Sequence, residues 1–399
     1  MNHITRNDFT KPDGPTLNIA VTVRQITPGT WTSPILYASS VRPNFGGATS
    51  GLYDSRNDFV GHDVIWIDHR DVGRSDGRTV CAGVAAATPL SFELEKPLIK
   101  QCLETANDFA AVRRSLGVTN WSVFTTGTSF EYAIRLSKLD PGTIASIVAF
   151  NPNVAGLGLS IASLTHAFEE YTKGCAESTE CAANGRFDEI FARAKEAAKT
   201  TSVTKIIDPS TNQLVALDMQ SFIQGVALGI SDPSLAPILP ALLSKPANAA
   251  WNDSVAKLFV QRAILLDAFD VALNCQPLDY IYPSQKSWAT ATGPYAGYSR
   301  NYICDGLTGI PEASSIIGFD TDIPILTITS RYTGATNQQA VAEMLKNATR
   351  TTQVDVPGLN DIRVQLHDCW QATSQAFFAN PSGTTDTSCL TAGTVKIFK

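Results

Sequence analysis

Residues 124–141, FTTGTSFEYAIRLSKLDP, have the pattern of a strand that turns sharply into a helix. The short segment 122–124, SVF, leads into the turn, and a helical pattern then runs up to Pro141. Two residues compete for the tip of the turn, Gly127 and Ser129. The choice has chemical consequences, because only Ser129 offers a hydroxyl group.

Apolar strands alternate with helical patterns on both sides of this turn. We predict helices over 107–116 and 338–346, and strands over 16–25, 34–38, 63–68, 144–150, 323–329 and 352–356. Strands that are mostly apolar throughout and alternate with helices indicate an α/β fold, in which a mostly parallel sheet is covered on both faces.

The alternation stops after Asn151 and returns at about residue 318. Between these points the chain shows helical and loop patterns, among them 163–175, 187–200, 218–230 and 254–273. A connection of roughly 160 residues is larger than any ordinary loop. We therefore expect a core formed by 1–151 and 318–399, interrupted by a helical domain over 152–317.

Charge and composition exclude several classes of function. The net charge is −6 and there is no run of like charges, so we expect neither a nucleic acid nor a membrane surface as partner. No apolar run approaches the ~20 residues of a membrane helix. Residues 1–14 lack the hydrophobic stretch of a signal peptide. No CxxC pair occurs, and we expect no metal or other cofactor.

The cysteines are the strongest indication of compartment. There are eight, and they fall into sequence-local couples, which favours disulfides and an oxidising, secretory environment. The simplest pairing is 81–102, 175–181, 275–304 and 369–389, and the alternative is eight reduced, buried thiols in a cytosolic protein. Three glycosylation sequons, at Asn120, Asn252 and Asn347, add a little to the secreted interpretation.

Several motifs resemble one family. Residues 68–77, DHRDVGRSDG, resemble the D-x-R-G-x-G-x-S segment after the fourth strand of proline iminopeptidases and their secreted tripeptidyl-aminopeptidase-like relatives. The segments 11–21 and 324–333 resemble the same proteins. The resemblance implies the α/β-hydrolase fold, with the 152–317 insertion as a helical cap over the active site. It also implies a serine, an acid and a histidine in that chain order, and cysteine couples like those found here.

The same resemblance implies that the catalytic triad has been lost. We align this chain with the family's motif without a gap, starting from Ala133 and Pro141. Gly127 then takes the position of the family's catalytic serine, here called the nucleophile slot. Glycine also fits the strained backbone of such a turn without steric cost. The slot of the acid holds Thr333, and the slot of the histidine, eight residues before a cysteine, holds Asp361.

The surroundings of the site have changed as well. The glycine-rich oxyanion loop of the family is replaced by 39–43, SSVRP, which makes Ser39, Ser40 and Arg42 candidate pocket residues. Tyr332 begins the segment of the acid slot and is a further pocket candidate. The backbone N–H of Thr128, next to the nucleophile slot, is a candidate donor to a carbonyl oxygen.

Three functional hypotheses remain open. In the first, Asp361 performs acid–base chemistry of the isomerase, epimerase or lyase type on a small apolar or peptide-derived molecule under the cap. Against it stands the interpretation of Asp361 as a solvated carboxylate beside Arg363. In the second, the protein is an active serine hydrolase or aminopeptidase that uses Ser129 with His367. In the third, the protein only binds its ligand.

Overall fold

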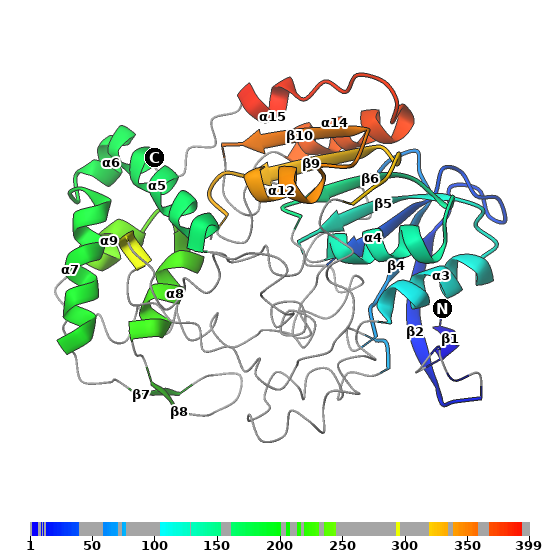
Figure 1. Cartoon of the computed structure of the whole chain (residues 1–399), viewed down its shortest axis with the longest axis horizontal. Helices are drawn as coiled ribbons and strands as arrows, with labels where there is room; N and C mark the ends of the chain where they lie inside the picture. Colours follow the sequence, from blue (N-terminus) through cyan, green and yellow to red (C-terminus); the bar gives the residue numbers. More distant parts are fainter. Residues whose placement is uncertain are drawn as a thin grey trace.

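The computed structural model describes most of the predicted core and part of the predicted cap (Figure 1). The described residues are 2–6, 9, 11, 13–39, 59–70, 74–76, 104–127, 129–152, 161–200, 205–207, 214–216, 219–230, 235–244, 293–295, 319–333, 338–357 and 367–392.

One eight-stranded sheet organises the core, in the order β1-β2-β4-β3-β5-β6-β9-β10. Its strands are β1 (Asn2–Arg6), β2 (Thr16–Arg24), β3 (Ile35–Ser39), β4 (Val64–Ile67), β5 (Trp121–Thr126), β6 (Ile144–Phe150), β9 (Ile325–Ser330) and β10 (Thr351–Val356). Within this described sheet, β2 pairs antiparallel with both neighbours, and the pairs from β4 to β10 are parallel. The predicted strands are confirmed to within two residues at each end, whereas β1 was not predicted.

Helices cover both faces of the sheet, as the apolar strands predicted. On one face lie α3 (Thr105–Ser115), α4 (Ser129–Leu139) and α12 (Gln338–Met344), and on the other lie α14 (His367–Ala379) and α15 (Ser388–Ala392). Neighbouring residues of β5 show the alternation: Val123 belongs to the first apolar core, and Phe124 packs on the second, 5.7 Å from the Trp370 ring. A strand buried on both faces has no solvent side, which explains why the adjacent residues Val123 and Phe124 are both apolar.

The insertion between β6 and β9 contains five described α-helices and has an apolar core of its own. The helices are α5 (Ile161–Glu177), α6 (Thr179–Ala182), α7 (Phe187–Thr200), α8 (Met219–Ile230) and α9 (Leu239–Ser244), with a 3-10 turn, η5 (Gly293–Tyr295). They gather to one side of the sheet, at the left of Figure 1. None of the described helices is long and apolar enough to cross a membrane.

The expectation of helices and loops alone in this insertion was wrong at one place. The strands β7 (Lys205–Ile207) and β8 (Leu214–Ala216) pair antiparallel in a separate ribbon. Both carry the branched apolar residues that favour strands, and they flank a segment, DPSTNQ, that is rich in turn-forming residue types. The predicted helix over 254–273 lies outside the described residues, and the domain boundaries stay a prediction.

Two of the four predicted disulfides are present in the described part of the chain. Cys175 and Cys181 are bonded within the insertion, and Cys369 and Cys389 are bonded between α14 and α15. The couples 81–102 and 275–304 lie outside the described residues.

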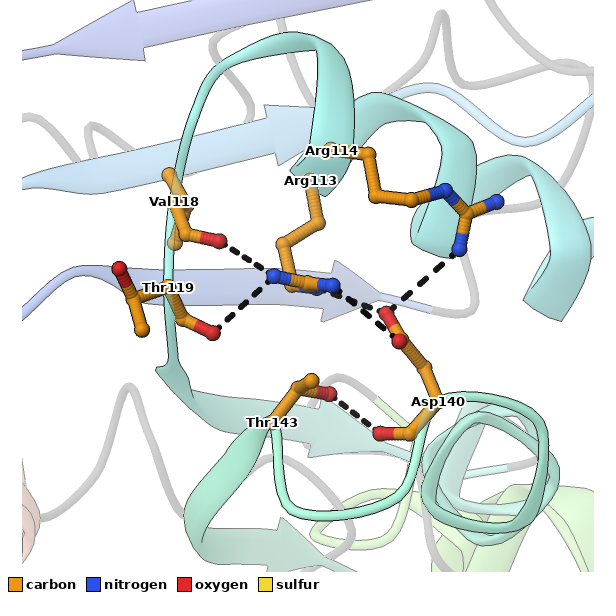
Figure 2. A network of polar contacts seen from close by, with 6 residues as sticks. All are labelled: Arg113, Arg114, Val118, Thr119, Asp140 and Thr143. Carbon is orange, nitrogen blue, oxygen red and sulfur yellow. Dashed lines mark hydrogen bonds and ion pairs between the residues drawn. The ribbon is translucent and has the colours of Figure 1, made fainter.

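One polar network joins the beginning of β5 to the end of α4. Figure 2 shows Arg113, near the end of α3, holding Asp140 through two hydrogen bonds of 2.7 and 3.1 Å and also donating to the Thr119 carbonyl (3.0 Å). Thr119 precedes β5 and Asp140 follows α4, so one guanidinium group joins the beginning of the strand to the end of the helix. The turn between them is therefore held at a defined place on the sheet.

Candidate functional site

The turn between β5 and α4 lies at the carboxyl edge of the parallel strands. Gly127 occupies this turn with a φ of +56°, in the left-handed region that favours glycine. Its N–H donates to the Phe150 carbonyl at 2.9 Å, and its own carbonyl accepts a bond from the N–H of Phe130 at 3.3 Å. The first bond ties the turn to the end of β6, and the second starts the helix.

Ser129 is placed differently. It is the first residue of α4, and its side chain is fully buried, with 0% of the residue exposed. Its Oγ has no hydrogen-bond partner among the described residues. Two residues further on, the buried Glu131 carboxylate pairs with Arg135 at 2.6 Å. Ser129 is thus a packed residue at the start of the helix, and its hydroxyl is shielded from solvent.

The acid slot follows β9 at the same edge of the sheet. Thr333 is 1% exposed, and its N–H donates to the Ser330 carbonyl at 3.2 Å. Asn151, directly after β6, lies between this slot and the Gly127 turn in strand order. Its side-chain oxygen accepts the N–H of Ser330 at 2.6 Å, and its φ is +42°. We did not predict Asn151, although an asparagine directly after a buried strand is a recognisable signal, because asparagine tolerates left-handed backbone.

The insertion contacts the core beside the acid slot. Arg331 is held by Asp355 of β10, with bonds of 2.9 and 3.0 Å, and also lies 3.7 Å from the Glu170 carboxylate of α5. Tyr332 packs against the apolar cluster of the insertion helices. Burial, and then the negative charge of Glu170, raise the pKa of the Tyr332 phenol above its ordinary value. Tyr332 therefore lies where insertion and core meet.

The structure brings only some of the predicted site residues together. Ser39 ends β3 in parallel register with Thr126, so the chain leaves β3 next to the Gly127 turn. His367 begins α14, on the face of the sheet opposite α4. The predicted residues Thr128, Ser40, Arg42 and Asp361 lie outside the described residues.

Two other histidines, His69 and His166, lie in contrasting surroundings. His69, after β4, is 7% exposed, and its ring packs 5.6 Å from the Phe109 ring and 4.8 Å from the Tyr132 ring. Burial lowers the pKa of this imidazole from 6.5 to about 4. His166 is exposed on α5. No group of three or more metal-ligating side chains occurs among the residues that the structure describes.

The strand order, with the antiparallel β2 and the exchanged positions of β3 and β4, defines an α/β-hydrolase fold with a helical insertion after β6.

No protein-family model and no curated protein matches the chain. Solved structures whose chains follow a similar path have low sequence identity to this chain and low TM-scores. They include a proline iminopeptidase from Mycobacterium smegmatis, with 11% identity, 96% of this chain and 98% of that chain covered and a TM-score of 0.43. A proline iminopeptidase-related protein from Thermus thermophilus has 14% identity, 95% and 98% coverage and a TM-score of 0.41. An esterase from Thermogutta terrifontis has 12% identity, 96% and 100% coverage and a TM-score of 0.44.

Proposed function

We propose that this α/β-hydrolase-fold protein has lost the serine–acid–histidine triad and binds a small apolar or peptide-derived molecule beneath its helical cap. One observation supports this proposal above all. Gly127 stands in the strand-to-helix turn with left-handed backbone, while the nearest serine of α4, Ser129, is fully buried.

Hydrolysis through a covalent intermediate needs a hydroxyl that a substrate carbonyl can reach and a base that takes its proton. Gly127 has no side chain to present. The Ser129 hydroxyl is not open to a substrate in the folded protein, because this residue is 0% exposed. In the acid slot, Thr333 offers a buried hydroxyl where a carboxylate would orient the base.

The resemblance leaves Asp361 in the slot of the histidine, and this carboxylate is the acid–base group of the proposal. It would remove a proton from a carbon next to a carbonyl, and the N–H of Thr128 would polarise that carbonyl. The reaction class is then isomerisation, epimerisation or elimination. The same proposal includes a protein that binds its ligand without converting it, in which Asp361 removes no proton.

The proposed ligand would lie close to Tyr332, because this residue packs against the insertion helices beside the acid slot. We also propose that the protein is secreted or matures in another oxidising compartment. The two disulfides in the described part of the chain support this environment.

A fluorophosphonate probe tests the loss of the nucleophile. We expect the intact mass of the protein to remain unchanged after incubation, both in the wild type and in Ser129→Ala. Ser137→Ala, on the same helix, is the matched control. A covalent adduct that maps to Ser129 and disappears in Ser129→Ala, but not in Ser137→Ala, would contradict the proposal and restore the serine-hydrolase hypothesis.

A second experiment tests the acid–base group. A panel of ketones, esters and peptide amides is incubated with the protein in heavy water, and deuterium uptake next to the carbonyl is measured by mass spectrometry. We expect uptake into at least one compound, and we expect Asp361→Asn to abolish it. Asp320→Asn, which alters an exposed carboxylate, serves as the control. Uptake that survives in Asp361→Asn would show that another group removes the proton.

A further inference from the structure

Two of the three glycosylation sequons lie on exposed loops at one edge of the sheet. Asn120 is exposed and directly precedes β5, and Asn347 is exposed in the connection between α12 and β10. We propose that both asparagines carry N-linked glycans. This inference rests on the oxidising compartment proposed above. The third sequon, at Asn252, lies outside the described residues.

The local structure around Asn120 suits an acceptor site. The preceding residue, Thr119, is held through its carbonyl by Arg113 at 3.0 Å, as Figure 2 shows, and the following residue, Trp121, is 1% exposed. The chain thus enters the core immediately after Asn120, and a glycan attached there would point away from it. The Ser122 hydroxyl, which the sequon requires during transfer, lies 2.8 Å from the Ser146 hydroxyl in the folded protein.

At the second sequon, too, an exposed asparagine is followed by a residue that packs against the core. Asn347 and Thr349 are exposed, and Ala348 between them packs against the apolar core that α3, α4 and α12 share. The N–H of Thr349 donates to the Thr321 carbonyl at 3.0 Å, which fixes the loop to the segment before β9. A half-buried central residue between two exposed ones keeps the acceptor amide on the surface.

Both sites lie opposite the candidate functional site. The strands β5 and β10 are parallel members of one sheet, and the two asparagines precede their amino ends, whereas Gly127 follows the carboxyl end of β5. Six residues of strand separate Asn120 from Gly127. At a rise of about 3.3 Å per residue this amounts to roughly 20 Å. Glycans at these positions would cover the amino edge of the sheet and leave the carboxyl edge open to ligands.

The chemistry requires a lipid-diphosphate-linked oligosaccharide as donor. The side-chain nitrogen of asparagine forms a bond to the anomeric carbon of the sugar, the bond from that carbon to the diphosphate breaks, and the nitrogen loses one proton. Neither oxidation nor reduction occurs. The product is a bulky, hydrated surface group.

The test uses the full chain, secreted from insect cells behind an added signal sequence. Peptide N-glycosidase converts each glycosylated asparagine to aspartate, and peptide mass spectrometry then identifies the positions. We expect conversion at Asn120 and Asn347, and the loss of one glycan mass in Asn120→Gln and in Asn347→Gln. Asn380 is the matched control, because it is exposed and followed by Pro381 and Ser382, a sequence in which proline blocks the sequon.

The outcomes separate this inference from the proposal on which it rests. An unmodified Asn120 or Asn347 in secreted protein with intact disulfides overturns the assignment for that position, and leaves the proposed compartment and function standing. Free thiols in protein isolated from its own cells would overturn the compartment, and with it the glycans.

Discussion

Replacing Gly127 with alanine adds a Cβ atom to a residue whose φ is +56°. Left-handed backbone costs an ordinary L-residue about 1–2 kcal/mol. Part of this cost is offset, because alanine lowers the conformational entropy of the unfolded chain, which contributes about 0.4–1 kcal/mol. The net loss in the free energy of unfolding is therefore about 1 kcal/mol, roughly a fivefold change in the unfolding equilibrium.

Gly117 provides the matched control for this measurement. Its φ is +67°, and a Cβ atom added there would meet nothing within 4 Å, so Gly117→Ala measures the backbone cost alone. Guanidinium unfolding of both variants, followed by tryptophan fluorescence, should show a similar loss in each. If Gly127→Ala is as stable as the wild type while Gly117→Ala is destabilised, the backbone at Gly127 is not left-handed in solution. That result would refute a left-handed glycine at the tip of the turn.

Three further predictions concern stability. The pKa of His69 is lowered to about 4 in the folded protein, so the unfolded chain binds the extra proton first as the pH falls below 6.5. The contribution of His69 to the free energy of unfolding should be fully present above pH 6.5 and fall by about 3 kcal/mol towards pH 4. His69→Phe should remove this part of the pH dependence. Identical pH profiles of stability in the wild type and in His69→Phe would contradict the predicted role of burial. Arg113→Ala breaks the network of Figure 2 and should cost about 2–3 kcal/mol. The Arg114 side chain is 57% exposed and lies 3.9 Å from Asp140, so Arg114→Ala should cost less than about 1 kcal/mol. Equal losses in urea unfolding would argue against the network. Replacing both cysteines of the 369–389 disulfide by serine opens a loop with a sequence separation of 20 and should cost about 3 kcal/mol. The same change in the 175–181 pair, with a separation of 6, should cost about 2 kcal/mol. A larger loss for the 175–181 pair in thermal unfolding would contradict the loop-entropy estimate.

The fold was largely predictable because its signals are local. The strand over 144–150 was predicted with the bounds that β6 has, since a strand buried on both faces is apolar along most of its length, here with Ser146 as the one polar residue. β1 was missed because five residues with the sequence NHITR show neither a long apolar run nor a clear alternation. Its place at the edge of the sheet comes from pairing with β2, a contact that no local pattern records.

The candidate site was only partly predictable, for a similar reason. The sequence placed a glycine and a serine two positions apart, and a threonine after a late strand. It did not show that Asn151 bridges the ends of β6 and β9, because that bond joins residues 179 positions apart in the chain. Nor did it reveal that Arg331 connects β10 to the insertion helix α5.

Conformational preferences and apolar periodicity act over a few residues, so the amino-acid sequence was enough to predict the α/β alternation, the large insertion and a glycine that suits a strained turn. Burial and pairing depend on neighbours that are distant in the chain. Only the folded structure could therefore show that the Ser129 hydroxyl is shielded from solvent and that Tyr332 packs against the insertion. It also placed two glycosylation sequons at the edge of the sheet opposite Gly127. For Ser129 and Tyr332 the deciding contacts are made by packed interfaces, whose energy arises only when both surfaces are present.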